Sequence, residues 1–235
     1  MLTPNSLKVN EKDFVLEVED LSVIRSGKLV ISDINFWLSK GEFVGIVGPN
    51  GSGKTTLLLS ILGILKANSG KIRIYGCEPM CNSNDGRISW VSQAASNLPN
   101  NLRITVRELV KLGTISSSNM FSFSSNSKNS AVDKAIEMVD LKNEENTDVG
   151  RLSGGQRQRA VIARALASQA DFIILDEPLV GIDREARNSL LKLLDDLCHD
   201  AGKTILMVSH DLAAIRQTAH RMIYLEETIK FDGET

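Results

Sequence analysis

The sequence predicts an α/β protein with a mainly parallel sheet, an N-terminal antiparallel β subdomain and a helical insertion subdomain. Three observations lead to this fold class. Near the N-terminus, short segments alternate apolar and polar residues, which is typical of antiparallel strands with one solvated face. Later, continuously apolar runs alternate with segments of helical length, as in a parallel sheet covered by helices. The middle third of the chain has a helical pattern.

Length and charge fit one compact domain. The chain has 235 residues, 42% of them apolar, and a formal net charge of −2 from 27 basic and 29 acidic side chains. Such a chain can bury a core, and its length suits one α/β domain with a smaller appendage better than two independent enzymes. A charge near zero argues against nucleic acid as the main ligand, because phosphate-backbone binding usually needs a concentrated basic surface.

Neither a membrane span nor a cysteine framework is predicted. The longest apolar stretch, Leu57–Leu65, falls far short of the roughly 20 residues that span a bilayer. The first dozen residues are polar and have no apolar run of a signal peptide, so we expect a cytosolic chain. Cys77, Cys81 and Cys198 fit neither a disulfide framework nor a zinc site, and we expect small buried or semi-exposed residues.

The first strands lie before residue 50. Phe14–Val18 and Ile31–Phe36 alternate apolar and polar residues, with turn residues at Ser26-Gly27 and Lys40-Gly41, and are predicted to be antiparallel strands. The run Phe43–Val47 is continuously apolar, as in a buried parallel strand.

A helix and two short strands come next. Thr55–Leu65 is apolar nearly all round and predicts a buried helix. Lys71–Tyr75 and Ile88–Val91 are predicted to be short strands, separated by a polar segment.

The middle third predicts helices. Thr105 and Glu108 form a capping box whose helix stops at Gly113. Residues 116–130 are mostly Ser and Asn, and this composition predicts a mobile loop. A second amphipathic helix is indicated by an apolar stripe formed by Val132, Ala135, Ile136 and Val139.

The α/β order returns after Gly155. A helix to about Ala167, a strand over Phe172–Leu175, a leucine-rich helix and a strand over Thr204–Val208 are predicted. We therefore expect a single domain over residues 1–235. Its parts are the β subdomain with the first half of the core over 1–93, the helical insertion over 94–152 and the remainder of the core over 153–235.

A phosphate-binding loop is predicted between the Phe43–Val47 strand and its helix. The match to G-x-x-x-x-G-K-[ST] consists of Gly48, Pro49, Asn50, Gly51, Ser52, Gly53, Lys54 and Thr55. Glycines let backbone N–H groups face phosphate oxygens, Lys54 would reach the β- and γ-phosphates, Thr55 would ligate Mg²⁺, and Thr56 adds a donor. The alternative is a plain glycine turn. With strand and helix in place, the motif predicts a P-loop NTPase core.

Two carboxylates end the Phe172–Leu175 strand. Asp176 could bind the Mg²⁺ shell while Glu177 polarises the water that attacks the γ-phosphate. The alternative is an acidic strand end that caps the next turn, assisted by Pro178.

The segment Leu152-Ser153-Gly154-Gly155-Gln156 precedes a helix. Ser153 and Gln156 have capping-box spacing, so a structural role is open. Two glycines in a first helical turn cost about 1 kcal/mol each, unless something such as a phosphate must approach the backbone. With the phosphate loop before it and the acidic pair after it, the segment resembles the signature of the ATP-binding cassette family. The resemblance covers nearly the whole chain.

The resemblance implies a dimeric ATPase with ATP and Mg²⁺. Family members pack head to tail, so Ser153, Gly154, Gly155 and Gln156 would act on ATP held by a second copy of the chain, in a homodimer formed with ATP bound. Further implied partners are an integral-membrane permease and an external substrate-binding protein.

Three more positions match family motifs. Gln93 matches the glutamine that touches Mg²⁺ or the attacking water, and His210 matches the histidine that contacts the γ-phosphate and helps to place Glu177. Asp183 matches the loop that couples the two sites. Read without the family, Gln93 is ordinary loop polarity, His210 a strand-end residue beside the helix cap Asp211, and Asp183 the N-cap of the next helix.

One position departs from the family pattern. Where an aromatic residue normally stacks on adenine, this sequence has Arg25. A guanidinium can also stack on a flat ring, so we expect Arg25 to contact the base with weak selectivity for ATP over GTP.

The resemblance also implies a transport function. The sequence is most similar to the zinc and manganese uptake group, which implies import of a divalent metal ion through a separate permease. The chain would then lie in the cytoplasm, on the inner face of the cell membrane. Alternatives are an iron-complex or other transporter of the family and a soluble non-transport ATPase.

Overall fold

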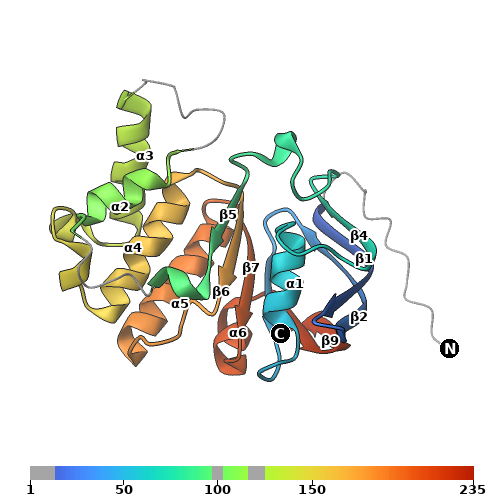
Figure 1. Cartoon of the computed structure of the whole chain (residues 1–235). Coiled ribbons are helices and arrows are strands. Elements are labelled where there is room, and N and C mark those ends of the chain that lie inside the picture. Colours follow the sequence, from blue (N-terminus) through green and yellow to red (C-terminus); the bar gives the residue numbers. More distant parts are fainter. Residues whose placement is uncertain (1–13, 97–102, 116–124) are drawn as a thin grey trace.

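A computed structural model describes residues 14–96, 103–115 and 125–235. Figure 1 shows helix α1 (Lys54–Ile61) lying between two sheets, with the remaining helices beside the larger sheet. In the described part of the chain, the smaller sheet has three antiparallel strands in the order β2-β1-β4. These strands are β1 (Phe14–Arg25), β2 (Lys28–Ser39) and β4 (Ser69–Ile74). The prediction of an N-terminal antiparallel β subdomain is confirmed.

The larger sheet is mainly parallel, as predicted. Within the described residues it has the order β5-β6-β7-β3-β8-β9, with every neighbouring pair parallel except β8 and β9. Strands β8 and β9 were not predicted from the sequence. The bounds are β3 (Phe43–Val47), β5 (Ile88–Val91), β6 (Phe172–Asp176), β7 (Thr204–Ser209), β8 (Arg221–Glu226) and β9 (Thr228–Glu234).

The helices beyond α1 cover the other face of this sheet and extend past its β5 edge (Figure 1). They are α2 (Val106–Leu112), α3 (Ser125–Met138), α4 (Gly154–Ala167), α5 (Arg184–His199) and α6 (Leu212–Thr218). Short 3₁₀ turns occur at Asn82–Asn84, Gln93–Ser96, Lys142–Glu144 and Val149–Arg151. No helix among the described residues is both long and apolar enough to cross a bilayer.

Two hydrophobic clusters lie on opposite faces of the parallel sheet. Strand β6 shows the division, because Phe172 packs with α1 and the antiparallel sheet, whereas Ile173 packs with α2 to α6. Neighbouring residues of a strand point to opposite faces, so a strand buried on both sides must be continuously apolar. This requirement explains the unbroken apolar runs in the sequence.

Helix α1 is shorter than predicted. It ends at Ile61 rather than Leu65, and Gly63 adopts a left-handed conformation with φ of 72°. The N–H of Ile64 donates to the carbonyl of Leu59, and that of Gly63 donates to the carbonyl of Ser60. This is the Schellman pattern that terminates helices at glycine.

The loop predicted over residues 116–130 is wrong in its second part. Residues 125–130 belong to α3, and residues 116–124 lie outside the described residues. The later turns of α3 bury Val132, Ala135 and Ile136 in the helical cluster. Packing of an amphipathic face stabilises a helix more than local propensity does, so the Ser and Asn residues of its first turns are tolerated.

Candidate functional site

Glycines of the phosphate loop adopt conformations or make contacts that disfavour a side chain. Gly51 and Gly53 have φ angles of 81° and 98°, in the region that side chains disfavour. A Cβ at Gly48 would lie 2.1 Å from the carbonyl oxygen of Leu225 on β8. The loop therefore packs tightly on the sheet and leads into α1, whose N-terminal N–H groups favour an anion.

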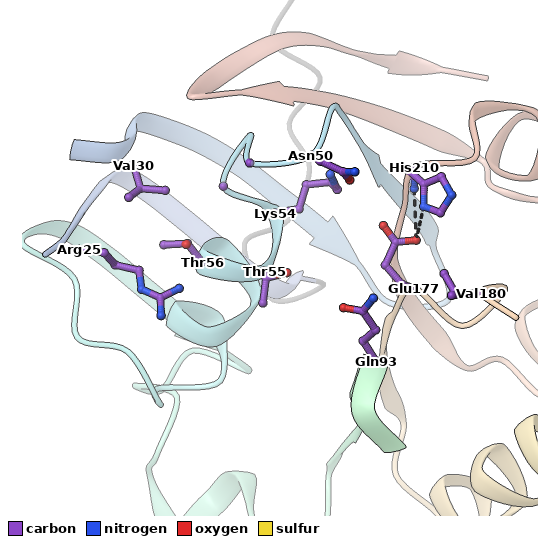
Figure 2. A pocket seen from close by; sticks show the side chains of 12 residues that line it. Arg25, Val30, Asn50, Lys54, Thr55, Thr56, Gln93, Glu177, Val180 and His210 are labelled. Atoms are coloured by element: carbon purple, nitrogen blue, oxygen red, sulfur yellow. Dashed lines mark hydrogen bonds and ion pairs between the residues drawn. The ribbon is translucent and has the colours of Figure 1, made fainter. Parts of the chain in front are cut away.

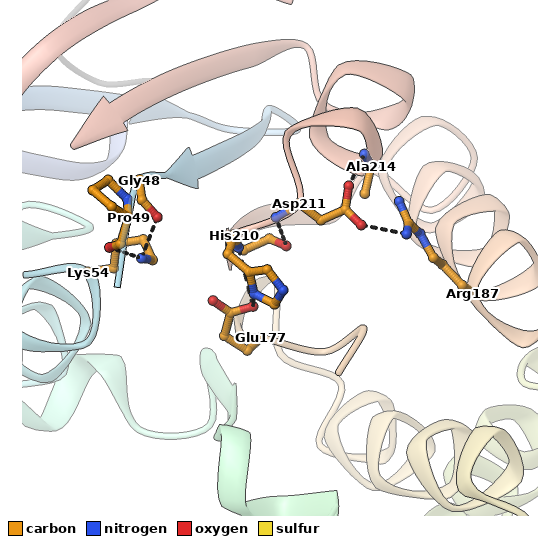
Figure 3. Close-up of polar contacts among 9 residues, drawn as sticks. Gly48, Pro49, Lys54, Glu177, Arg187, His210, Asp211 and Ala214 are labelled. Atoms are coloured by element: carbon orange, nitrogen blue, oxygen red, sulfur yellow. Dashed lines mark hydrogen bonds and ion pairs between the residues drawn. The ribbon is translucent and has the colours of Figure 1, made fainter. Parts of the chain in front are cut away.

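Lys54 is buried and bonded to its own loop. Its Nζ donates to the carbonyl oxygens of Gly48 at 2.7 Å and Pro49 at 2.9 Å (Figure 3). Burial lowers the pKa of Lys54, and the nearby charges of Glu177 and Asp176 oppose that shift. The two loop carbonyls thus hold the ammonium group in place.

A cavity of about 620 Å³ opens beside the loop (Figure 2). It brings together four parts of the predicted site that are distant in sequence: the phosphate loop, Arg25, Gln93 and the Glu177–His210 pair. The complete lining is Arg25, Val30, Asn50, Gly51, Gly53, Lys54, Thr55, Thr56, Gln93, Glu177, Val180 and His210. Ser52 and Asp176 are buried and do not line the cavity.

Glu177 and His210 contact each other at the carboxyl ends of β6 and β7. Oε2 of Glu177 lies 2.8 Å from Nδ1 of His210 and accepts a hydrogen bond from its backbone N–H at 3.3 Å. Glu177 has a φ of 52°, a left-handed conformation that costs on the order of 1 kcal/mol for a residue with a side chain. With this backbone turn, Glu177 lines the cavity, whereas Asp176 is buried and does not line it.

Asp176 fits a site for a hard cation. Its side chain is 4% exposed, and its Oδ1 has no hydrogen-bond partner among the described residues. Burial, followed by the charge of Glu177, raises its pKa to about 6, and Lys54 opposes the shift. An unpartnered buried carboxylate oxygen is rare in proteins and calls for a ligand. Asp176 does not line the cavity that holds Thr55 and Gln93, but its carboxylate, the Thr55 hydroxyl and the Gln93 amide are oxygen donors of the kind that Mg²⁺ prefers.

The Ser153–Gln156 segment lies in a different hollow. Ser153 Oγ accepts from the Gln156 N–H at 3.2 Å, and Gln156 Oε1 accepts from the Ser153 N–H at 3.0 Å, so the capping box is formed. The hollow, of about 460 Å³, shares no described lining residue with the first cavity. It is lined by Ser153, Gly155, Gln156, Arg159, Asp183, Glu185 and Ala186.

The two signature glycines have different surroundings. A Cβ at Gly155 would lie 2.6 Å from the Cβ of Ala186 on α5, so this glycine lets α4 and α5 approach each other. A Cβ at Gly154 would meet the carbonyl oxygen of Gly181 at 3.0 Å. Gly155 is therefore needed for the close packing of α4 and α5, a role that the sequence pattern of α4 does not reveal.

Asp183 caps α5, which is the structural role left open by the sequence. Its side chain accepts a hydrogen bond from the Ala186 N–H at 2.9 Å. Asp183 also lines the second hollow, so the cap is compatible with the predicted role in coupling two nucleotide sites. Asp211 caps α6 in the same way and forms an ion pair with Arg187 of α5 (Figure 3).

Five residues that line the cavity or the second hollow were not predicted from the sequence: Val30, Val180, Arg159, Glu185 and Ala186. Val30 faces the first cavity close to Arg25, and Val180 lies on its opposite side, near Glu177 (Figure 2). Arg159 lines the second hollow and donates to Ser189 at 2.7 Å. Its signal was present, because residues three apart on a helix share a face and Arg159 lies three residues after Gln156. For the two valines, only the fold reveals the location.

Comparison with known proteins gives consistent results. Residues 31–180 match the family model described as ABC transporter. The chain is 37% identical over 220 residues to the zinc uptake system ATP-binding protein ZurA of Listeria innocua, covering 93% of this chain and 85% of that protein. It is 34% identical over 221 residues to the manganese transport system ATP-binding protein MntA of Synechocystis sp., covering 94% and 84%.

Solved structures with the same architecture include two cassettes. One is cbiO1 from Clostridium perfringens, part of the ABC transporter complex cbiONQ, with a TM-score of 0.84 and 26% identity over 94% of this chain and 89% of that chain. The other is the dimeric post-hydrolysis structure of the ATP-binding cassette MJ0796 bound to ADP and Pi, with a TM-score of 0.76 and 27% identity over 93% and 98%.

Proposed function

Since the chain belongs to the ABC transporter family, we propose that it is the Mg²⁺-dependent ATPase subunit of a transporter, in which two copies close around two ATP molecules and drive a separate membrane permease. The observation that carries this proposal is the cavity that joins the phosphate loop to Gln93, Glu177 and His210. These residues come from four separate parts of the sequence. Phosphoryl transfer needs groups that bind the phosphates, hold the metal ion and position the attacking water at one place.

The phosphate loop would hold the triphosphate. Backbone N–H groups of the loop and the N-terminus of α1 favour anions, and Lys54 would exchange the carbonyls of Gly48 and Pro49 for phosphate oxygens. Arg25 and Val30, on the side of the cavity formed by the antiparallel sheet, would contact the base.

Thr55, Gln93 and Asp176 would hold Mg²⁺. The unpartnered Oδ1 of Asp176 supports this assignment, because the carboxylate is buried beside the loop without another use. When bound, the ion neutralises charge on the β- and γ-phosphates. Gln93 lies opposite the phosphate loop in the cavity (Figure 2), so the water that attacks the γ-phosphate would be confined to the space between them.

Glu177 would take the proton from the attacking water. His210 positions it, since one carboxylate oxygen receives both the backbone N–H and a contact from the imidazole. General-base catalysis typically contributes about 10²- to 10⁴-fold in rate. Glu177→Gln should therefore lower ATP turnover by about this factor while ATP binding is retained. Turnover at the wild-type rate would refute the assignment.

The Ser153 hollow would bind the ATP of the other copy. Ser153, Gln156 and Asp183 line a surface separate from the cavity of their own chain, which supports action across a dimer. The Ser153 hydroxyl accepts a bond in the cap, so its proton remains available to a phosphate oxygen. The N-terminus of the 14-residue helix α4 adds a partial positive charge, and Gly154 lies at its first position.

A substitution at this surface separates dimer formation from nucleotide binding. In a Glu177→Gln background, which would slow turnover, ATP should convert monomer to dimer in size-exclusion chromatography. Adding Ser153→Arg should abolish that conversion by steric blockage, while ATP affinity of the monomer stays unchanged. A normal ATP-driven dimer in the double variant would contradict the trans arrangement.

The cargo we propose is a zinc or manganese ion, imported by a permease that this chain contacts on the inner face of the membrane. The support is similarity to proteins named for zinc uptake and manganese transport. An external substrate-binding protein would deliver the ion. A chelated iron complex is the alternative cargo, favoured by 33% identity to a protein of the chelated iron transport system of Yersinia pestis.

Reconstitution tests the cargo. The permease that co-purifies with the chain would be placed with it and its binding protein in liposomes, and uptake of Zn²⁺, Mn²⁺ and a ferric chelate would be compared. ATP-dependent accumulation of Zn²⁺ or Mn²⁺, lost with Glu177→Gln, is expected. Accumulation of the chelate alone would select the alternative, and failure to recover a membrane partner would favour a non-transport ATPase.

A further inference from the structure

Two cysteines share one hydroxyl group on the loop that joins β4 to β5. Ser83 Oγ lies 3.1 Å from Cys77 Sγ and 3.0 Å from Cys81 Sγ. Both cysteines are half-buried free thiols, and neither lines the cavity or the hollow described above. The function proposed for those two sites therefore leaves this pair without a role.

Backbone hydrogen bonds hold both cysteines in an ordered turn. The Cys77 carbonyl accepts from the Ile74 N–H at 2.7 Å, and its N–H donates back at 3.1 Å. Cys81 donates to the Glu78 carbonyl at 3.0 Å and accepts from the Asn84 N–H at 3.0 Å. Asn84 is itself 5% exposed. The two sulfurs are thus brought together by an ordered turn rather than by chance approach of free chain.

The shared hydroxyl lies at nearly the same distance from both sulfurs but cannot donate to both at once. A serine hydroxyl carries one proton, so it can donate to only one of them. The hydrogen bond with the Ser83 hydroxyl is the largest cause that lowers the pKa of the Cys81 thiol. Burial opposes this shift, and the Cys77 thiol and backbone N–H groups lower the pKa further. Cys198 is the opposite case, because it is 3% exposed and burial raises its pKa to about 11. The thiolate is the reactive form of cysteine.

We propose that Cys77 and Cys81 are a reversible redox-modification site that closes to an intramolecular disulfide. With hydrogen peroxide as oxidant, the Cys81 thiolate attacks one peroxide oxygen, forms a sulfenic acid and releases hydroxide, which takes up a proton to become water. Cys77 sulfur then displaces the sulfenic hydroxyl, which leaves as a second water with the Cys77 proton. Two thiols give two electrons to one peroxide, and a small dithiol reverses the change by exchange.

Disulfide chemistry suits the pair better than a metal ion. A structural zinc site takes four protein ligands, whereas the described residues bring only two sulfurs and a hydroxyl together here. The disulfide would close a short loop that contains Pro79 and Met80.

That short loop contacts the end of α1. A Cβ at Gly63, where α1 ends, would lie 2.6 Å from Met80 Cγ and 3.2 Å from Pro79 Cβ. The same two residues form part of the wall of a groove of about 710 Å³. Drawing the two cysteines together would therefore reshape this groove, which shares no described lining residue with the cavity beside the phosphate loop.

The first experiment maps the oxidised cysteines in the intact protein. The reduced protein would be exposed to graded hydrogen peroxide, blocked with iodoacetamide and digested. We expect a Cys77–Cys81 linked peptide, an intact mass lower by two hydrogens, complete reversal by dithiothreitol and an unlinked Cys198. Cys198→Ser should behave like the wild type. Both cysteines alkylated after peroxide, oxidation beyond sulfenic acid without a link, or a link between two chains would each overturn the proposal.

Two variants test the order of the reaction. In Cys77→Ser, peroxide should leave Cys81 as a sulfenic acid that dimedone traps, because the resolving sulfur is absent. In Ser83→Ala, the pH at which iodoacetamide labels Cys81 half-maximally should shift upward, while the melting temperature stays that of the wild type. Trapping at Cys77 in Cys81→Ser but no trapping in Cys77→Ser would refute the assigned order, and an unshifted labelling profile would refute the role of Ser83.

Discussion

The contact between Gly155 and Ala186 gives a sharp test of how the signature helix is built. A Cβ added at Gly155 would lie 2.6 Å from the Ala186 Cβ. Carbon atoms in contact are normally about 3.5–4.0 Å apart, so α4 and α5 would have to separate by about 1 Å in Gly155→Ala. Overpacking of this kind costs about 1–3 kcal/mol, and the better helix propensity of alanine returns about 1 kcal/mol.

Because those two effects oppose each other, a double-mutant cycle is more decisive than the single variant. Ala186→Gly removes the opposing Cβ, so the swapped protein with Gly155→Ala and Ala186→Gly has no overlap. We expect a favourable coupling free energy of about 1–3 kcal/mol between the two sites. The swap should also preserve ATP-driven dimer formation if the ligand contacts the backbone N–H of residue 155. It should not do so if the ligand needs the space that a side chain would fill.

Urea unfolding of the wild type, both single variants and the swap measures the coupling. The matched control is Gly154→Ala in the same cycle, because its Cβ would meet the carbonyl of Gly181 and not Ala186. Sites without a shared contact add within about 0.5 kcal/mol. Coupling below that value for Gly155, or equal coupling for both glycines, would refute the packing explanation.

Three further predictions follow from the first cavity. Lys54→Ala should raise the dissociation constant for ATP about 10- to 100-fold through loss of a charge-assisted hydrogen bond worth about 1.5–3 kcal/mol; an unchanged constant in a fluorescent-nucleotide titration would contradict it. In buffer without Mg²⁺ and nucleotide, Asp176→Asn should raise the free energy of unfolding above pH 6 by at most about 3 kcal/mol. The reason is that burial raises the pKa of the native carboxyl from 3.8 to about 6, so ionising this group above pH 6 destabilises the folded state. That gain should shrink as the pH falls from 6 towards 4, and a gain independent of pH in urea unfolding would refute it. With Arg25 at the base position, steady-state turnover of ATP and GTP should be similar, and a strong preference for ATP would refute weak base selectivity.

The sheet architecture could be predicted because the apolar pattern of a strand depends on how many of its faces are buried. The runs at residues 43–47 and 172–175 are unbroken since both faces meet a hydrophobic cluster. β8 and β9 were not recognised, and the exposed pattern of β9, which pairs only with β8 among the described strands, explains why its signal is weak.

Helix boundaries depended on signals of different strength. The end of α1 was marked in the sequence by Gly63, which takes the left-handed conformation that terminates helices. The start of α3 at Ser125 had no such mark, because Ser and Asn favour loops unless tertiary packing overrides them. The apolar stripe with Val132 and Ile136 predicted the later turns of this helix, whereas composition did not reveal that the helix extends back to Ser125.

The identity of the candidate site residues came from motifs, but their division into two places came from the fold. Residues of the phosphate loop and Glu177 share a cavity, whereas Ser153 and Asp183 share another hollow. Spacing along a chain does not determine such grouping. Likewise, Ala186 as the reason for Gly155 is a contact between two helices, and no pattern within either helix contains it.

The position of α1 between the two sheets has a consequence for how a ligand would affect the whole molecule. The cavity takes Arg25 and Val30 from the antiparallel sheet, and Glu177 and His210 from the ends of parallel strands. A molecule bound there joins the two layers, so its binding free energy is added to the cost of separating them. Amide exchange should then slow in β1 and β2 together with β6 and β7, and the two sheets would open as one cooperative unit.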